Sequence, residues 1–269
     1  VGTHQPDAKN LYVPGSGDNL GMTLGTAKEF FPSIPEIKEW TRFSDYYTDK
    51  GAVVDGQYFH VQARAIDSNF LDMMGMKCRG CAVHQVLTDM HQALISESFA
   101  NRAFGNANPI GQVVTCDTLQ FKVVGIVDDF GREDLLEPTD IFVSMKLKEK
   151  DLDPMDQFGE VVTIAQLADN ADPEKVNATL LNKYMGYWKK WWSRKKTTGS
   201  FLWGSSLVRW DKLYFSDITC SHVRHGSKTL VNVLLIVALV LLLSAIFNYI
   251  NLTVAQIGNR AKEMATRRL

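Results

Sequence analysis

The sequence predicts an α+β domain followed by a transmembrane helix, and three observations support this fold class. Residues 229–259 contain no charged side chain. Two strand-like runs, 52–54 and 57–65, flank Asp55-Gly56, a pair typical of a tight β-hairpin turn. Asp172-Pro173-Glu174 has the pattern of a helix start, with Asp as N-cap and Pro at the first helical position. Helices and strands are therefore expected together, ahead of a membrane segment.

Residues 229–250 form the predicted transmembrane helix. Its centre reads LVNVLLIVALVLLLSAIFNYI and is interrupted only by Asn232, Ser244 and Asn248. A bilayer core about 30 Å thick needs roughly 20 apolar residues in a helix. A core helix of a large soluble protein is the alternative, but such a helix usually carries a polar stripe. We therefore expect membrane anchoring.

The residues beside the span predict its orientation, because Lys and Arg near a membrane segment tend to remain in the cytoplasm. Arg224 and Lys228 precede the span. The residues that follow it, offset by Glu263, are Arg260, Lys262, Arg267 and Arg268. Residues 251–269 are thus expected in the cytoplasm, and residues 1–228 outside it as an extracytoplasmic domain.

The N-terminal residues carry no export signal, since VGTHQPDAKN has neither a basic start nor an apolar stretch. An exported domain needs an earlier membrane segment or a signal peptide. We therefore expect the sequence to be part of a longer protein. Its net charge of -1 argues against a nucleic-acid partner, and 45% hydrophobic with 22% charged residues is typical of a globular domain.

Capping residues and β-branched runs predict the other elements of the outer domain. Ser96 is expected to cap a helix that stops at Gly105, and Asp67-Ser68-Asn69 to cap a shorter one. The expected helices are 25–31, 70–74, 96–104 and 173–188, with a proline turn at 32–35, and the further strands are 112–115, 121–127, 141–145 and 161–167.

The segment YWKKWWSRKK, at 187–196, mixes aromatic and basic residues. This composition suits a membrane interface, where rings lie at headgroup depth and cations meet anionic lipids. It equally suits a solvated helix end whose tryptophans belong to the core. Both interpretations stay open at the level of sequence.

Four cysteines are present: Cys78, Cys81, Cys116 and Cys220. The Cys78-Arg79-Gly80-Cys81 spacing allows a disulfide, or a redox or metal site that His84 and His91 could complete. A zinc site needs two more ligands at matching spacing, and a thioredoxin-like site needs βαβ surroundings. Because neither context is present, unlinked thiols and solvated histidines are the favoured interpretation, with a disulfide next.

No catalytic, cofactor-binding or metal-binding set emerges from the motifs. The sequence lacks a Gly-x-Ser-x-Gly elbow, a His-Glu-x-x-His pair and a phosphate-binding loop ending in Gly-Lys-Ser/Thr. Four acids could bind calcium, but their spacing differs from that of an EF-hand loop, so a solvated turn is favoured: Asp128, Asp129, Glu133 and Asp134. We therefore expect a non-enzymatic protein without a cofactor.

Three segments, in this order, resemble the MacB/FtsX family of ABC transporter permeases, in particular its MacB-like periplasmic core domain. They are ISES-A-FG-NPIG followed by FKVVGIV within 95–127, the end of the span FNYINL at 247–252, and RAKEMATRR at 260–268. The similarity is weaker before Ile95, where it rests on the strand pair near Tyr58 and on Asp67-Ser68-Asn69-Phe70. The Cys78 to Cys81 stretch and the tryptophan-rich segment are outside the family pattern.

The resemblance implies a mixed α/β lobe with an inserted β-rich lobe, at about 106–146, and a parent with further spans in the bacterial inner membrane. It also implies a cytoplasmic ATPase subunit as partner, a permease dimer and a periplasmic or outer-membrane partner. The expected contacts with the ATPase subunit are Arg260, Glu263, Arg267 and Arg268, although contact with lipid headgroups alone is an equal alternative. Asn248 is the candidate for a helix contact inside the membrane, because an unpaired amide is costly in hydrocarbon.

A membrane receptor with an extracytoplasmic sensor domain would share this topology and is the alternative function. Such a receptor would continue after Leu269 into a soluble signalling module, whereas a permease would continue into further hydrophobic spans. A membrane-tethered enzyme is a third class, for which the sequence offers no catalytic residues. The molecule exported or extracted is left open.

Overall fold

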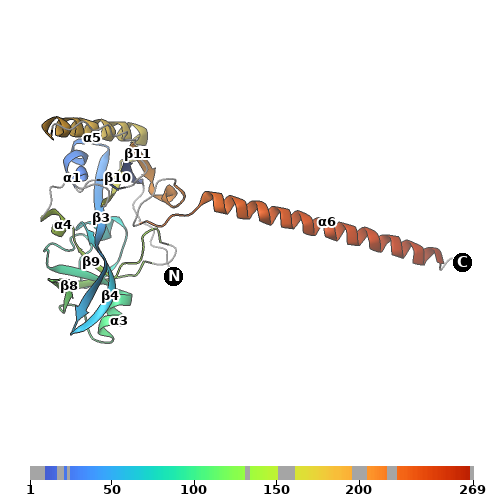
Figure 1. Cartoon of the computed structure of the whole chain (residues 1–269), viewed down its shortest axis with the longest axis horizontal. Coiled ribbons are helices and arrows are strands. Elements are labelled where there is room, and N and C mark those ends of the chain that lie inside the picture. The colour runs from blue at the N-terminus through green and yellow to red at the C-terminus, as the bar shows by residue number, and fades with distance from the viewer. Residues whose placement is uncertain are drawn as a thin grey trace. The chain divides into compact units, whose positions relative to one another are not determined.

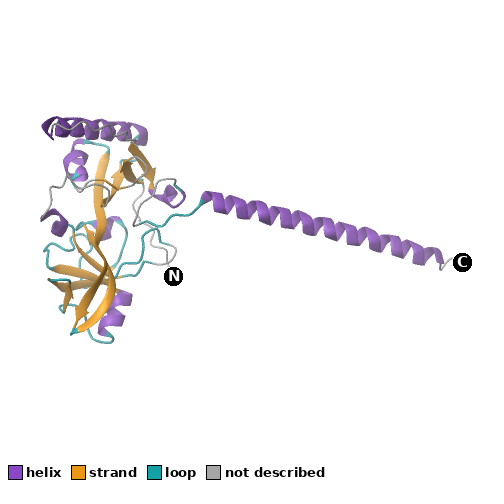
Figure 2. Ribbon diagram, viewed as in Figure 1, coloured by secondary structure: helices purple, strands orange, loops and turns teal. Residues whose placement is uncertain are grey.

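A computed structural model describes residues 10–16, 21–22, 25–130, 134–150, 161–195, 205–216 and 223–266. The chain divides into two compact units, Val1–His225 and Gly226–Leu269. Strands and helices are mixed in the first unit, whereas the second is one long helix (Figure 2). The α+β fold class is confirmed.

Eleven strands and eight helical segments occur in the described ranges. The strands are β1 (Leu11–Ser16), β2 (Gly21–Met22), β3 (Ile37–Val54), β4 (Gln57–Ile66), β5 (Cys78–Arg79), β6 (Gln92–Ser96), β7 (Val113–Cys116), β8 (Leu119–Val127), β9 (Ile141–Ser144), β10 (Val161–Leu167) and β11 (Ser205–Arg209). The α-helices are α1 (Thr26–Phe30), α2 (Phe70–Met73), α3 (Glu97–Phe104), α4 (Lys146–Lys150), α5 (Pro173–Lys195) and α6 (Lys228–Thr266), and the 3₁₀ helices are η1 (Phe31–Ser33) and η2 (Trp210–Phe215).

The strands form one sheet in the order β11-β1-β10-β3-β4-β9-β6-β8-β5, with β2 on β10 and β7 bridging β3 and β8. The pairs β4–β9 and β6–β8 are parallel, and the others are antiparallel. The long strand β3 runs from the end of the domain that carries α1 and α5 toward the end that carries α3 (Figure 1). One backbone thus connects both ends of the domain.

The predicted hairpin is confirmed, with Asp55 and Gly56 at positive φ between β3 and β4. Strand β3 is much longer than the three residues predicted. The prediction missed most of it because charged residues such as Glu39 and Arg42 interrupt the alternation of apolar and polar residues that indicates a strand. Its register with β4 shifts near Tyr47, where the longer strand bends.

Capping explains where two of the predicted helices begin. The Ser96 hydroxyl accepts a hydrogen bond from Phe99 N at 3.1 Å and starts α3, which ends at Gly105 with φ of 57°. Asp172 Oδ1 accepts from Glu174 N at 3.1 Å before α5, which continues past the predicted end at residue 188. Both starts are confirmed.

The predicted side-chain cap of α2 is wrong. Asn69 occupies the N-cap position but makes no capping bond. Its amide instead donates to Glu39 Oε1 and to the Trp40 carbonyl, both at 3.0 Å. The Asp67 carboxylate is used by Arg42. The side chains of Asn69 and Asp67, which local sequence predicted to cap the helix, therefore form hydrogen bonds with residues of β3 instead.

Three hydrophobic clusters fill the domain. At the α5 end, Phe30 and Phe31 pack with Leu180, Tyr184 and Trp188. A second cluster lies under α3, and a third joins the residues around α2 to β1 and β10. Helix α5 contributes one buried stripe at i, i+4 spacing to the first cluster: Val176, Leu180, Tyr184 and Trp188.

Helix α6 is apolar on every side. Within Lys228–Ile257, an 18-residue window has a mean hydropathy of 3.0, and none of that window is buried within the described structure. A core helix of a soluble protein would be covered by other elements. By length and composition, this segment fits a membrane span.

Candidate functional site

The first third of β3 carries a buried arginine that joins four parts of the domain. Arg42 is 1% exposed and donates from Nε and Nη2 to Asp67, directly after β4, at 2.8 and 2.7 Å. Its Nη2 also donates to Glu149 Oε1 on α4 at 2.7 Å, and Glu149 pairs with Lys28 on α1. We refer to Lys28, Arg42, Asp67 and Glu149 as the Arg42 network.

Charge pairing decides the ionisation of this network. Burial alone would lower the pKa of the Arg42 guanidinium, but hydrogen bonds and charge from Asp67 and Glu149 raise it. Burial alone would raise the pKa of Glu149, whereas hydrogen bonds from Lys28 and Arg42, and their charges, lower it. Arg42 and Glu149 are therefore both charged at neutral pH, and the network joins α1, β3, β4 and α4.

Two further polar contacts reinforce the same region. Lys148 Nζ on α4 donates to the Ser44 hydroxyl on β3 at 2.7 Å. On β4, Arg64 donates from Nη2 to Glu137 Oε2 at 3.0 Å and from Nη1 to the Glu137 carbonyl at 3.1 Å. The segments before and after β9 are thus both tied to the long hairpin.

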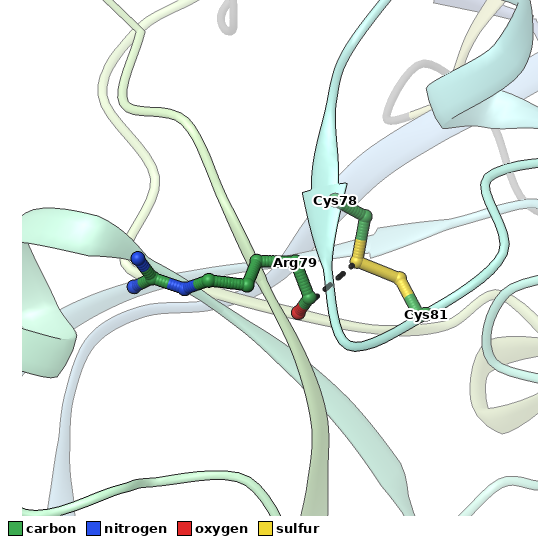
Figure 3. The surroundings of a disulfide bond; sticks show 3 residues. All are labelled: Cys78, Arg79 and Cys81. Carbon is green, nitrogen blue, oxygen red and sulfur yellow. Dashed lines mark hydrogen bonds between the residues drawn. A yellow bond between two sulfur atoms is a disulfide. The ribbon is translucent and has the colours of Figure 1, made fainter.

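Cys78 and Cys81 form a disulfide, with Cα atoms 5.7 Å apart (Figure 3). The interpretation as unlinked thiols is therefore wrong. Gly80 closes the turn between them at φ of 92°, in the left-handed region that favours glycine. The bonded sulfurs pack on Gly125 of β8, beside the pairing of Cys78 with Val127. The 3.8 Å contact between Cys78 Sγ and the Arg79 carbonyl is only a contact, since a disulfide sulfur carries no proton.

Within the described ranges, no group of three His, Cys, Asp or Glu side chains is placed to hold a metal ion. His84 Nδ1 lies 2.7 Å from Asp72 Oδ2. Asp129 accepts hydrogen bonds from the backbone N and the hydroxyl of Ser98, at the start of α3. Of the other acids considered for calcium, Asp134 is buried, and Glu133 lies outside the described residues.

The described surface includes two hollows. One of about 270 Å³ lies beside the disulfide turn and is lined by Arg79, by Asn101 of α3, and by Asn106 and Asn108 of the loop after α3. The other, of about 500 Å³, is a shallow depression along β7 and β8 near His91. Neither contains a nucleophile with an adjacent base, so neither has the geometry of a covalent catalytic site.

The described structure shows no contact partner for the residue predicted to pair inside the membrane or for the residues predicted to contact an ATPase subunit. Asn248 is exposed on α6. Arg260 and Glu263 belong to α6, but their side chains lie outside the described residues, as do Arg267 and Arg268 entirely.

At the tryptophan-rich end of α5, the described residues agree with the interpretation as a solvated helix end with a core tryptophan, and the membrane-interface interpretation stays a prediction. Trp188 is 2% exposed and packs edge-on against Tyr184 and Tyr187, so it is a core tryptophan. Lys189 and Lys190, which follow it, are exposed. Sequence alone could not separate these roles, because the buried stripe ends within the segment.

Comparisons with known proteins place this geometry in a family. The model of the MacB-like periplasmic core domain matches residues 3–183. No curated protein matches the chain.

Two solved structures share the fold. A domain of a putative permease protein from Porphyromonas gingivalis matches with a TM-score of 0.61 and 16% identity, over 79% of this chain and 93% of that one. The periplasmic region of MacB from Actinobacillus actinomycetemcomitans matches with a TM-score of 0.55 and 14% identity, over 77% of this chain and 91% of that one. At this identity, they show the fold alone. The family match covers more than half of the chain, and the chain therefore belongs to the MacB-like periplasmic core domain family, whose members are parts of ABC transporter permeases.

Proposed function

We propose that the chain is the outer domain and following span of a MacB/FtsX-type permease subunit, which transmits ATP hydrolysis in the cytoplasm to a periplasmic domain for efflux or extraction of a substrate. The observation that carries this proposal is the family match over residues 3–183, followed in the same chain by the 30-residue apolar segment of α6. The proposed parts are a periplasmic domain at 1–228 with its β-rich lobe at about 106–146, a span at 229–250 and a cytoplasmic segment at 251–269.

The length of α6 supports transmission by a rigid element. Its 39 residues extend about 58 Å at 1.5 Å per residue, whereas the hydrocarbon core is about 30 Å thick. The helix therefore has length to spare beyond the bilayer without a break. A continuous helix can carry a displacement if each end is packed against a domain.

The Arg42 network supports the same function within the outer domain. Transmission requires that the domain moves as a body, and ion pairs formed by a buried arginine resist separation of the elements that they join. The network connects the hairpin β3–β4 with α1 and α4. No catalytic step is assigned to the chain, and the ATPase is proposed to be a separate cytoplasmic subunit.

The proposed contacts with this ATPase are Arg260, Glu263, Arg267 and Arg268. Asn248 is proposed to pair with another transmembrane helix, within the permease or across a permease dimer. The parent protein is proposed to span the inner membrane several times and to engage a periplasmic or outer-membrane partner.

Co-purification of the full-length parent from detergent tests the proposal. We expect a nucleotide-binding ATPase to accompany the parent, and the variant Arg267→Glu/Arg268→Glu to lose it. Lys77→Glu/Lys122→Glu is the matched control, because it makes the same charge change at two exposed lysines of the outer domain. Recovery of no ATPase, together with a soluble signalling module after Leu269, would overturn the permease in favour of a receptor.

A further inference from the structure

We propose that the basic C-terminal half of α5 binds the anionic phospholipid headgroups of the membrane that holds α6. This inference rests on α6 crossing a membrane, as in the proposed function, but not on any ATPase. It assigns a lipid-binding surface to the outer domain.

Helix α5 and the residues that follow it form a basic region of the sequence. Between Lys175 and Trp210 the sequence contains no Asp or Glu and eight basic residues: Lys175, Lys183, Lys189, Lys190, Arg194, Lys195, Lys196 and Arg209. The chain as a whole has a net charge of -1. This segment is therefore a local basic region in a nearly neutral protein, and its charge is complementary to an anionic surface.

Two lysines in the C-terminal half of α5 are exposed. Lys189 and Lys190 are exposed on α5, and neither makes an ion pair with a described carboxylate. Lys38 and Lys28, by contrast, pair with Asp169 and Glu149. The positive charge of Lys189 and Lys190 is thus available to a ligand from outside the chain, whereas Lys175 at the start of α5 pairs with Asp172.

Helix α5 is held in place by packing against the core. Trp188 and Tyr184, buried in the core at the α5 end, fix the helix along its inner face. Lys189 and Lys190 follow the buried Trp188 directly and leave the core for the surface. A fixed helix presents its lysines without a further ordering cost, and lysine stems reach a lipid surface while the helix stays on its own domain.

A short segment of the chain connects this part of the domain to α6. Helix α5 packs against β11, and β11 leads through η2 to α6. From Phe215, at the end of η2, to Lys228, at the start of α6, thirteen residues can extend over at most about 45 Å. In η2, Tyr214 and Phe215 are 40% and 39% exposed, as expected for rings at a membrane interface. The linker therefore limits the distance between Phe215 and the start of α6 to about 45 Å.

Electron paramagnetic resonance on the full chain tests the inference. A nitroxide is attached to Ser193→Cys, at an exposed position of α5, in a Cys220→Ser background. Collisions with oxygen and with a polar nickel chelate are compared in nanodiscs of phosphatidylcholine alone and of phosphatidylcholine mixed with phosphatidylglycerol. We expect the nickel collisions to fall only where phosphatidylglycerol is present, and to recover at high salt.

Two double variants decide whether the lysines cause this contact. Each lysine near an anionic bilayer contributes about fivefold to the contact equilibrium, so Lys189→Gln/Lys190→Gln lowers it about 25-fold. The control Lys77→Gln/Lys122→Gln removes the same charge from exposed lysines elsewhere in the domain and should leave the contact intact. A nitroxide that is equally accessible to nickel in both lipids overturns the inference, as does a contact that survives Lys189→Gln/Lys190→Gln. The first of these results would still leave the ATPase partnership intact.

Discussion

Arg42 and Asp67 hold each other through four hydrogen bonds in both directions. Asp67 Oδ2 accepts from Arg42 N at 2.9 Å and from Nε at 2.8 Å, and Oδ1 accepts from Nη2 at 2.7 Å. Asp67 N in turn donates to the Arg42 carbonyl at 3.2 Å. The backbone of β3 is thereby fixed to the chain that leaves β4.

Replacement of Asp67 by Asn should destabilise the domain by about 3 kcal/mol, because it removes one partner of a buried ion pair and leaves the other charge in place. Urea unfolding of the full chain in detergent, followed by near-ultraviolet circular dichroism, measures the effect. Asp169→Asn is the matched control, since Asp169 pairs with Lys38 at 3.6 Å and is 83% exposed. Equal unfolding midpoints for the two variants would contradict a structural role for the Arg42–Asp67 pair.

The lowered pKa of Glu149 predicts a dependence of stability on pH. A carboxylate with a depressed pKa in the folded state contributes stability that is complete above its unfolded value, about 4.3. This contribution is lost as pH falls through the lower folded value. The difference in unfolding free energy between the natural chain and Glu149→Gln should therefore be constant near neutral pH and shrink below about pH 4.3. A Glu149 difference that stays flat into acid would refute the assignment.

The thiol of Cys116 should resist alkylation in the folded protein. Cys116 is buried and free, and burial raises its pKa to about 12. At pH 8 a thiol of ordinary pKa, about 8.5, is about one quarter thiolate, so the reactive fraction of Cys116 is lower by about two thousandfold. Iodoacetamide labelling in a Cys220→Ser background should be slow by this factor relative to an exposed Thr118→Cys, and urea should restore it. Rapid labelling without urea would show that β7 opens in the native state.

The elements that sequence predicted are those whose signals are local. The Asp55-Gly56 turn, the Ser96 cap and the Asp172-Pro173 start each need only a few neighbouring residues, and each is found where predicted. The transmembrane segment is a composition signal of the same kind. Local chemistry suffices for these elements because no distant partner competes for the residues involved.

The elements that sequence missed depend on distant partners. From sequence alone, Arg42 would be interpreted as a solvated charge, because its partners Asp67 and Glu149 lie 25 and 107 residues away in the chain. The strands β1 and β11 form only because they pair with each other and β1 also with β10. Nothing local in the sequence indicates these pairings. The spacing of Cys78 and Cys81 allowed a disulfide, but local sequence did not favour it over unlinked thiols, and Gly125 of β8, which lies against the bonded sulfurs, is distant in sequence.

The disulfide predicts that Gly125 cannot carry a side chain. A Cβ at Gly125 would lie 2.5 Å from Cys78 Sγ and 2.8 Å from Cys81 Sγ, and the bond between the sulfurs prevents either from turning away. Gly125→Ala should therefore cost about 1–3 kcal/mol through overpacking. Gly186→Ala is the matched control on α5, where an added Cβ meets nothing within 4 Å, and it should stabilise by up to about 1 kcal/mol. In a Cys78→Ala/Cys81→Ala background the penalty at Gly125 should largely disappear, because the obstructing sulfurs are gone. Thermal unfolding of the four variants measures these differences, and an unchanged penalty without the sulfurs would show that the β8 backbone, and not the disulfide, excludes the methyl group.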